Sequence, residues 1–183
     1  RKIISSNEPI GSSKLLLEKD FPIAVLIEAD NVDKFDYSNN RLDLTNINVF
    51  TIDESSTMDI DDGLSIECTD DGFTIGVHIT DIASKFSEGT DIDIEAHSRL
   101  SSFYAPETTV PMLPEKISYD IASLVPGVIR PAMTLLINFQ KDYTITNWEV
   151  VLSLVRSKRR LNYEEVDHIL SNFNDDEIFH KLQ

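Results

Sequence analysis

The residues best suited to chemistry lie in one short acidic stretch, TIDESSTMDIDDGLS, which runs from Thr51 to Ser65. Its four aspartates are Asp53, Asp59, Asp61 and Asp62. Four carboxylates within a few ångströms of one another cannot all stay ionised without compensation. Magnesium would supply that compensation, because it prefers carboxylate oxygens as ligands. Two such ions about 3.5–4 Å apart could stabilise both the attacking and the leaving oxygen of a phosphodiester displacement.

Other interpretations of the acidic stretch compete with a metal site. A solvated loop would disperse the repulsion, since runs of charge usually face water. A calcium loop of the EF-hand type does not fit, because Gly63 falls where the third ligand belongs when the pattern starts at Asp59. A helix cap would explain one carboxylate and leave three. On spacing alone, the metal site is one hypothesis and the solvated loop is another.

The elements that must position these carboxylates are rich in β-forming residues. Residues 47–52 predict a strand that leads directly into the acidic stretch. Asp53 would end that strand, and the five-residue loop after it could fold back to bring Asp53 beside the other three aspartates. Residues 64–68 and 72–82 flank the turn signal at 69–72 and predict a β-hairpin.

Further strands and helices follow from local patterns. Residues 22–30 predict a strand, and residues 133–140 with 144–155 predict a second hairpin. Residues 93–104 predict a helix with an aspartate at its N-cap. Another helix should start at Asn162, where a capping-box pattern precedes an apolar face.

Two more segments complete the predicted architecture. Three prolines in residues 105–118 exclude a regular helix and predict a rigid, extended loop. Asn174 and Glu177 repeat the capping pattern and predict a final short helix. The sum is an α+β fold, a mixed sheet with hairpins and flanking helices.

Composition narrows the class of protein. The chain has 183 residues and a net charge of −16, so it should repel nucleic acid at long range unless metal ions or other domains intervene. A single cysteine, Cys68, excludes an internal disulfide and indicates a reducing compartment, the cytoplasm or an organelle of bacterial origin. No apolar run is long enough to span a bilayer, so no membrane partner is expected. The first residue is arginine, so we expect a piece of a longer polypeptide.

Four motifs follow one another along the chain: FTIDESSTMDIDDGLS, GVHITDIASKFSEGTDIDIEAHSRLSSFYAPETTVPMLPEKIS, SLVPGVIRPAMTL and RLNYEEV. Together they resemble the ribonuclease II / ribonuclease R family in its catalytic RNB domain. The resemblance covers roughly residues 42 to 170, with three mild departures: Gly63 and Thr80 each replace a usual alanine, and Ile117 replaces a usual leucine. It implies an RNB-like fold and a magnesium-dependent 3′→5′ exoribonuclease that hydrolyses single-stranded RNA to nucleoside 5′-monophosphates.

The resemblance also implies roles for particular residues. Asp53, Asp59, Asp61 and Asp62 become the catalytic and metal-binding carboxylates, with two Mg²⁺ ions as cofactors. Tyr104 matches a tyrosine that packs against RNA near its 3′ end, and an aromatic ring can stack on any base. Arg99 and Arg130 are candidate phosphate contacts, with bonds to their own neighbours as the alternative. His78 and Asp81 are expected to be structural, and the basic run 156–160 either follows an RNA backbone or balances nearby acids.

We predict two parts in the chain. Residues 1–41 form an N-terminal connecting segment, and residues 42–183 form the N-terminal portion of an RNB domain whose C-terminal part is absent. The full-length protein should add that missing part and oligonucleotide-binding barrels. Two alternatives stay open: a truncated, noncatalytic RNA- or protein-binding module of the same family, and a plain divalent-cation site with a structural purpose.

Overall fold

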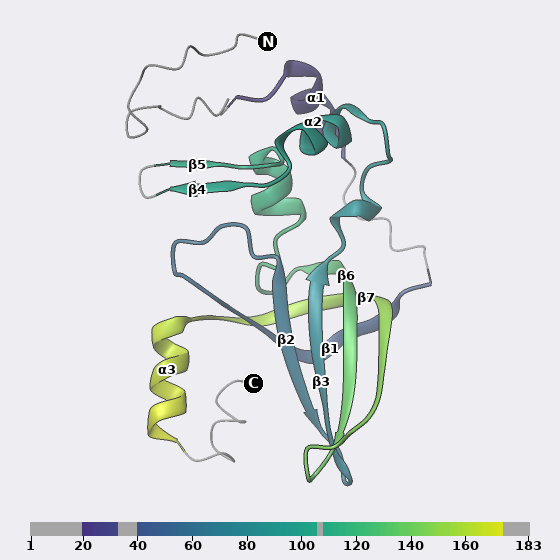
Figure 1. The fold of residues 1–183 in the computed structure, drawn as a ribbon, viewed down its shortest axis with the longest axis vertical. Helices are drawn as coiled ribbons and strands as arrows, with labels where there is room; N and C mark the ends of the chain where they lie inside the picture. The colour runs from purple at the N-terminus through teal and green to yellow at the C-terminus, as the bar shows by residue number, and fades with distance from the viewer. Residues whose placement is uncertain (1–19, 33–39, 106–107, 174–183) are drawn as a thin grey trace, which may run out of the picture.

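Strands that close into a barrel form the lower part of the computed structural model, which describes residues 20–32, 40–105 and 108–173 (Figure 1). The barrel strands are β1 (Leu42–Asp53), β2 (Asp62–Cys68), β3 (Gly72–Thr80), β6 (Ile129–Gln140) and β7 (Ile145–Asn162). They follow one another around the barrel in the order β1-β2-β3-β6-β7. The mixed sheet that the sequence predicts is therefore present, and the structure adds that the sheet closes on itself.

Both predicted hairpins are confirmed. β2 pairs with β3, and β6 pairs with β7, each in antiparallel register. The barrel closes differently, through a parallel pair of β1 and β7 that runs from Leu42 beside Ser153 to Asp53 beside Asn162. Closure therefore joins two segments that lie far apart in the sequence.

Helices and a small ribbon lie over one end of the barrel (Figure 1). They are α1 (Ile23–Asn31), the 3₁₀ turn η1 (Ile82–Ser84), α2 (Asp91–Arg99), β4 (Phe103–Ala105), β5 (Thr108–Val110) and the π-helical turn η2 (Lys116–Ile121). A separate helix, α3 (Tyr163–Asn172), follows β7. Among the helices described, none has the length and apolar character needed to cross a bilayer.

The strand predicted at residues 22–30 is wrong, because this segment forms α1. Val25 and Ala29 are four residues apart and only 3% and 2% exposed, so they bury one face of a helix. Ile23 and Ile27, by contrast, are exposed. The packing partners of α1 are distant in sequence, in α2 and η2, so a short apolar run alone could not distinguish a helix from a strand.

The other helix predictions hold in part. α2 begins at Asp91 with Thr90 as its N-cap, earlier than predicted. It ends at Arg99, because the backbone of Leu100 turns to a φ of 68°, and β4 follows from Phe103. α3 starts where expected, with the complete capping box between Asn162 and Glu165.

The proline-rich segment 105–118 forms no regular α-helix, but its described part is only partly extended. It contains β5 and the start of η2. The helix predicted from Asn174 lies outside the described residues.

A series of hydrogen-bonded polar side chains lies inside the barrel. The ring of His78 bonds Ser65 Oγ at 2.9 Å and Thr134 Oγ1 at 2.8 Å, and Thr134 Oγ1 bonds Ser153 Oγ at 2.6 Å. All four residues are buried, and burial lowers the pKa of His78 to about 4. His78 is therefore a satisfied core histidine, as the sequence predicts for it.

Candidate active site at the acidic end of the barrel

The ends of two strands bring the four aspartates to one end of the barrel. Asp53 is the last residue of β1, and Asp62 is the first residue of β2. Asp59 and Asp61 lie in the segment that connects these strands. The predicted return of the loop after Asp53 is thus observed, since both strand ends open on the same side.

Ile60 anchors the connecting segment between the two aspartates that flank it. Its side chain is 1% exposed and belongs to the apolar cluster inside the barrel. Its backbone N–H donates to Ser123 Oγ at 3.2 Å, and its carbonyl accepts from the N–H of Leu124 at 2.8 Å. Because Ile60 is fixed from both sides, Asp59 and Asp61 are held at the barrel rim.

Arg160 fixes the rest of the loop. Its Nη2 donates to three backbone carbonyls, those of Glu54 at 3.0 Å, Ser55 at 3.3 Å and Thr57 at 2.6 Å. Such bonds to carbonyls satisfy a tight loop that has few bonds of its own. The sequence showed Arg160 only as part of a basic run, so its role in shaping the loop was missed.

The aspartates share an electrostatic environment that favours protonation. The pKa of Asp61 is raised to about 6, first because surrounding atoms displace water and then because Asp59, Asp62 and Asp53 carry like charges. Asp61 is nevertheless exposed by its surface area, so solvent screens the neighbouring charges. Burial also raises the pKa of Asp53, with Asp62 and Asp59 acting in the same direction and Arg160 against them.

The four carboxylates share this end of the barrel without forming a tight ligand set. Within the described part of the chain, no three His, Cys, Asp or Glu side chains lie close enough together to hold one metal ion. Their chemistry nevertheless fits a hard divalent cation. Asp53 Oδ2 is buried without a hydrogen-bond partner among the described residues, and Asp61 resists ionisation. A cation would relieve both conditions, because opposite charge stabilises the ionised carboxylate.

Tyr104 reaches this site from β4. Its hydroxyl donates a hydrogen bond to Asp59 Oδ2, and the residue as a whole stays 61% exposed. Burial of the hydroxyl, followed by the bond to Asp59, raises the pKa of Tyr104 to about 12. Asp59 also lines two cavities, of about 300 Å³ and about 240 Å³, and Tyr104 lines the larger one. An aromatic face therefore lies directly beside the carboxylates.

Arg99 is engaged within the helical layer. Its guanidinium donates to Glu95 Oε1 at 2.8 Å and to the carbonyl of Asp20 at 2.9 Å, and it lies 3.8 Å from the centre of the Phe21 ring. These contacts match the alternative that the sequence left open, an arginine bonded to its own neighbours. Its phosphate contact stays a prediction.

Arg130 is buried and clamps η2 to β6. Nε donates to the carbonyl of Ser123 at 3.0 Å, and Nη2 donates to the carbonyl of Asp120 at 2.6 Å. The residue is only 7% exposed. The structure thus places Arg130 in a supporting position, and its RNA contact stays a prediction.

Asp81, which the sequence predicts to be structural, forms an ion pair. Asp81 pairs with Arg41 at 2.6 Å, and both side chains are largely buried, which ties the start of β1 to the end of β3. Nothing in the sequence pattern indicates this pair, because its members are forty residues apart.

Two side chains of the basic run 156–160 bond the backbone of β1 where the pairing of β1 with β7 is irregular. The pairing of β1 with β7 shifts register between Leu44 and Val49. There Arg156 donates to the carbonyl of Thr45 at 3.3 Å, and Lys158 donates to the carbonyl of Asn46 at 2.6 Å. These side-chain bonds therefore join β1 and β7 at the irregularity, and RNA contact by the basic run stays a prediction.

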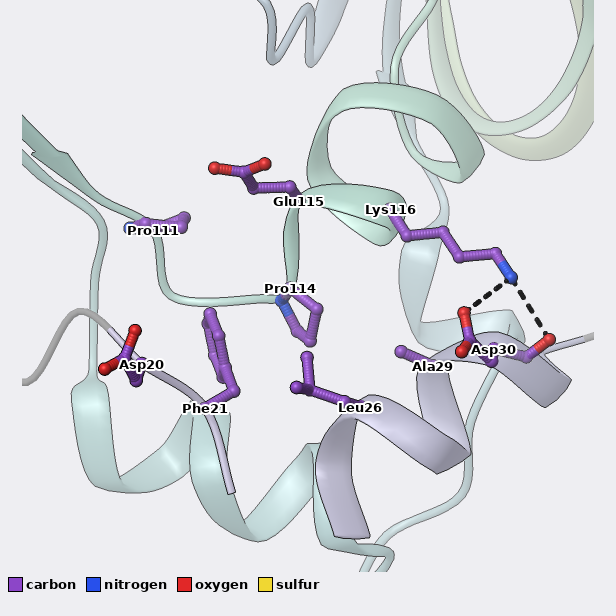
Figure 2. A pocket seen from close by; sticks show the side chains of 9 residues that line it. All are labelled: Asp20, Phe21, Leu26, Ala29, Asp30, Pro111, Pro114, Glu115 and Lys116. Atoms are coloured by element: carbon purple, nitrogen blue, oxygen red, sulfur yellow. Dashed lines mark hydrogen bonds and ion pairs between the residues drawn. The ribbon is translucent and has the colours of Figure 1, made fainter. Parts of the chain in front are cut away.

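A larger pocket of about 570 Å³ lies elsewhere, between α1 and residues 111–116 (Figure 2). Its lining residues are Asp20, Phe21, Leu26, Ala29, Asp30, Pro111, Pro114, Glu115 and Lys116. Lys116 Nζ closes one side by bonding Asp30 Oδ1 at 3.0 Å (Figure 2). This pocket shares no residue with the acidic end, so its size alone does not make it the reactive site.

Comparison with known proteins gives consistent matches. The family model for the RNB domain matches residues 41–181. Ribonuclease R of Chlamydia trachomatis is 34% identical over 166 residues, which cover 88% of this chain and 24% of that protein. The chain thus spans about a quarter of the length of the curated relatives it matches.

Solved structures agree on the fold. Mycoplasma genitalium RNase R, in complex with ribose methylated single-stranded RNA, superimposes with a TM-score of 0.79 at 30% identity, covering 89% of this chain and 27% of that one. Yeast Ssd1, described as a pseudonuclease, superimposes with a TM-score of 0.69 at 24% identity, covering 74% of this chain and 17% of that one. The second match shows the fold alone.

Proposed function

Because the chain belongs to the RNB domain family, we propose that it is the N-terminal portion of the catalytic domain of a 3′→5′ exoribonuclease. The proposed reaction is magnesium-dependent hydrolysis of single-stranded RNA to nucleoside 5′-monophosphates. Relatives named ribonuclease R, and a relative solved with single-stranded RNA, support this assignment. We further propose a cytoplasmic protein whose full length adds the rest of the RNB domain and oligonucleotide-binding modules.

One observation carries the proposal: all four aspartates of the acidic stretch gather at one barrel end, in a chain that matches the RNB model across that end. Asp53, Asp59, Asp61 and Asp62 would hold magnesium there. When bound, magnesium would stabilise the attacking and leaving oxygens of the displacement.

The chain's own groups complete the proposed site. Without a cation, burial and the charges of Asp59, Asp62 and Asp53 raise the pKa of Asp61 to about 6, so this carboxylate would gain most from a divalent ion beside it. The hydroxyl of Tyr104 orients Asp59, and the exposed Tyr104 ring offers a stacking face to a base.

The test is shortening of 5′-labelled single-stranded RNA from its 3′ end by the full-length protein in the presence of magnesium, with the released mononucleotides identified separately. We expect Asp61→Asn to lower the turnover rate by at least about a hundredfold, because it removes a ligand charge with little change in volume. Asp71→Asn is the matched control, since Asp71 lies in the β2–β3 turn, away from the site. Full activity of Asp61→Asn would overturn the proposal.

A second candidate function is a noncatalytic RNA- or protein-binding module. The observation that favours it is the absence of three converging carboxylates within the described residues. The same fold is also shared by a protein described as a pseudonuclease, so fold alone does not establish activity. RNA binding that survives chelation, with no nucleotide released by the full-length protein, would establish this second function.

A further inference from the structure

The cavity of about 300 Å³ beside Asp59 is lined by further residues that the proposed reaction has not used. Tyr104 and Tyr119 supply two aromatic rings, and Ser56, Thr57 and Thr109 supply hydroxyl groups. Its volume falls at the lower end of the range typical of small-molecule sites, about 300–1,000 Å³. A flat, polar ring system is the kind of ligand that such a lining suits.

Tyr119 reaches this cavity because of the local backbone. It lies in η2, whose Ile117 and Ile121 are buried in the apolar cluster of the helical layer. Tyr119 is half-buried and lines the cavity on the opposite side of this turn. π-Helical turns are rare and are found frequently at functional sites.

The charge of the cavity decides which part of a nucleotide fits. Asp59 contributes a carboxylate, and no lysine or arginine belongs to the lining formed by the described residues. A phosphate would be repelled there, whereas a neutral base would be accepted. Burial, and after it the charges of Glu115 and Asp59, raises the pKa of Tyr119, so its hydroxyl stays a neutral hydrogen-bond donor.

We propose that this cavity is a nucleobase subsite in which Tyr119 provides an aromatic wall in addition to Tyr104. The inference rests on the proposed function, since it needs an RNA strand at the acidic end. It assigns Tyr119 as a positioning residue, which holds one base and thereby places the adjacent backbone near the aspartates. Stacking on a ring does not read the identity of the base, so the subsite would accept any RNA sequence.

The test measures binding of single-stranded RNA to the full-length protein in EDTA, where no turnover occurs. Tyr119→Ala and Tyr119→Leu should weaken binding by roughly tenfold, and Tyr119→Phe should retain it, because only the ring is needed. Tyr143→Asn is the matched control, since it removes an exposed tyrosine from the β6–β7 turn at a position with φ 67° that asparagine tolerates. Thermal unfolding of each variant separates a loss of affinity from a loss of fold.

Oligonucleotides with one abasic position, moved through the last few nucleotides, make the test specific. At one position the missing base should weaken the binding of RNA by wild type. At that position wild type and Tyr119→Ala should then bind with the same affinity. The subsite would be overturned if Tyr119→Ala bound intact RNA as tightly as wild type. It would also be overturned if Tyr119→Ala bound more weakly than wild type at every abasic position. If this binding pattern holds while no nucleotide is released in magnesium, the proposed function fails and the subsite stands.

Discussion

Asp61 combines a conspicuous position in the sequence with an unusual pKa in the fold. Its folded-state pKa of about 6 lies above the ordinary value of 3.8, so the fold favours its protonated form. The stability that this preference contributes is present at low pH and is lost as the pH rises through about 6. A bound cation reverses the preference, because it stabilises the ionised carboxylate.

We therefore expect magnesium to raise the unfolding temperature more at about pH 7 than at about pH 5, since protons compete with the cation for Asp61. Thermal unfolding at both pH values, with and without magnesium, checks this. In Asp61→Asn the difference between the two pH values should shrink. An equal effect of magnesium at both pH values would show that Asp61 is no ligand.

His78 gives a second prediction at this scale, with the opposite sign. Its folded-state pKa of about 4 lies below the ordinary value of 6.5, so the protein should lose stability as the pH falls from 6.5 towards 4. The full effect is about 3 kcal/mol in the free energy of unfolding, because the buried ring must stay neutral. Denaturant unfolding across this range measures it. His97→Gln, which changes an exposed histidine on α2, should leave the loss unchanged.

The sequence identified the side chains that could take part in a reaction, but it did not identify the residues that surround and position them. The four aspartates stand out by type and spacing, and Tyr104 stands out through the family resemblance; the structure brings them to one end of the barrel. Arg41 was missed because its partner, Asp81, is distant in sequence. Tyr119 was missed because only the turn of η2 aims it at the cavity.

At the scale of elements, β3 depends on a position without a side chain. A Cβ built on Gly76 would lie 2.5 Å from Ser65 Oγ and 2.7 Å from Nε2 of His78. We expect Gly76→Ala to lower the free energy of unfolding by about 1–3 kcal/mol, because it forces the buried hydrogen-bonded chain apart. Denaturant unfolding tests this. Adding Ser65→Ala should recover part of the loss, and a loss that is purely additive would show that the clash is not with Ser65.

The helix α3 begins beside the last pair of β1 and β7, so its cap supports the acidic end. Asn162 accepts the N–H of Glu165 at 2.9 Å, and Glu165 accepts the N–H of Asn162 at 2.9 Å. Asn162→Ala should cost about 1 kcal/mol in the free energy of unfolding. Asn172→Ala, near the other end of α3, is the matched control and should cost less. An equal loss of unfolding free energy in the two variants would show that the N-cap does not stabilise α3 more than a residue at its other end does.

Local signals predicted elements well where the partners are neighbours in sequence. The hairpins β2–β3 and β6–β7 follow from turn residues between β-rich runs, and the start of α3 follows from its capping pattern. α1 was predicted as a strand because its helical face is defined by distant residues. Closure of the barrel was not predicted either, since nothing local marks the parallel pairing of β1 with β7.

At the scale of the whole molecule, net charge should govern the encounter with RNA. A protein that makes 6–10 phosphate contacts loses about 10³–10⁵ in affinity between roughly 50 and 200 mM salt. With a net charge of −16, the 183-residue chain should show a much shallower dependence in EDTA, because long-range repulsion is screened as salt rises. Fluorescence anisotropy of labelled single-stranded RNA measures the slope. A steep fall in affinity would contradict this picture and indicate a basic surface that overrides the net charge.

The parallel pairing that closes the barrel sets the order in which the nascent chain can assemble. Thr45 and Arg156, which bond across that seam, are separated by 111 positions. During synthesis, β1 leaves the ribosome long before its partner and waits with an open edge, of the kind that invites pairing with other chains. The rim that carries the aspartates can take its final form only after β7 has been made, because Asp53 at that rim pairs with Asn162, the last residue of β7.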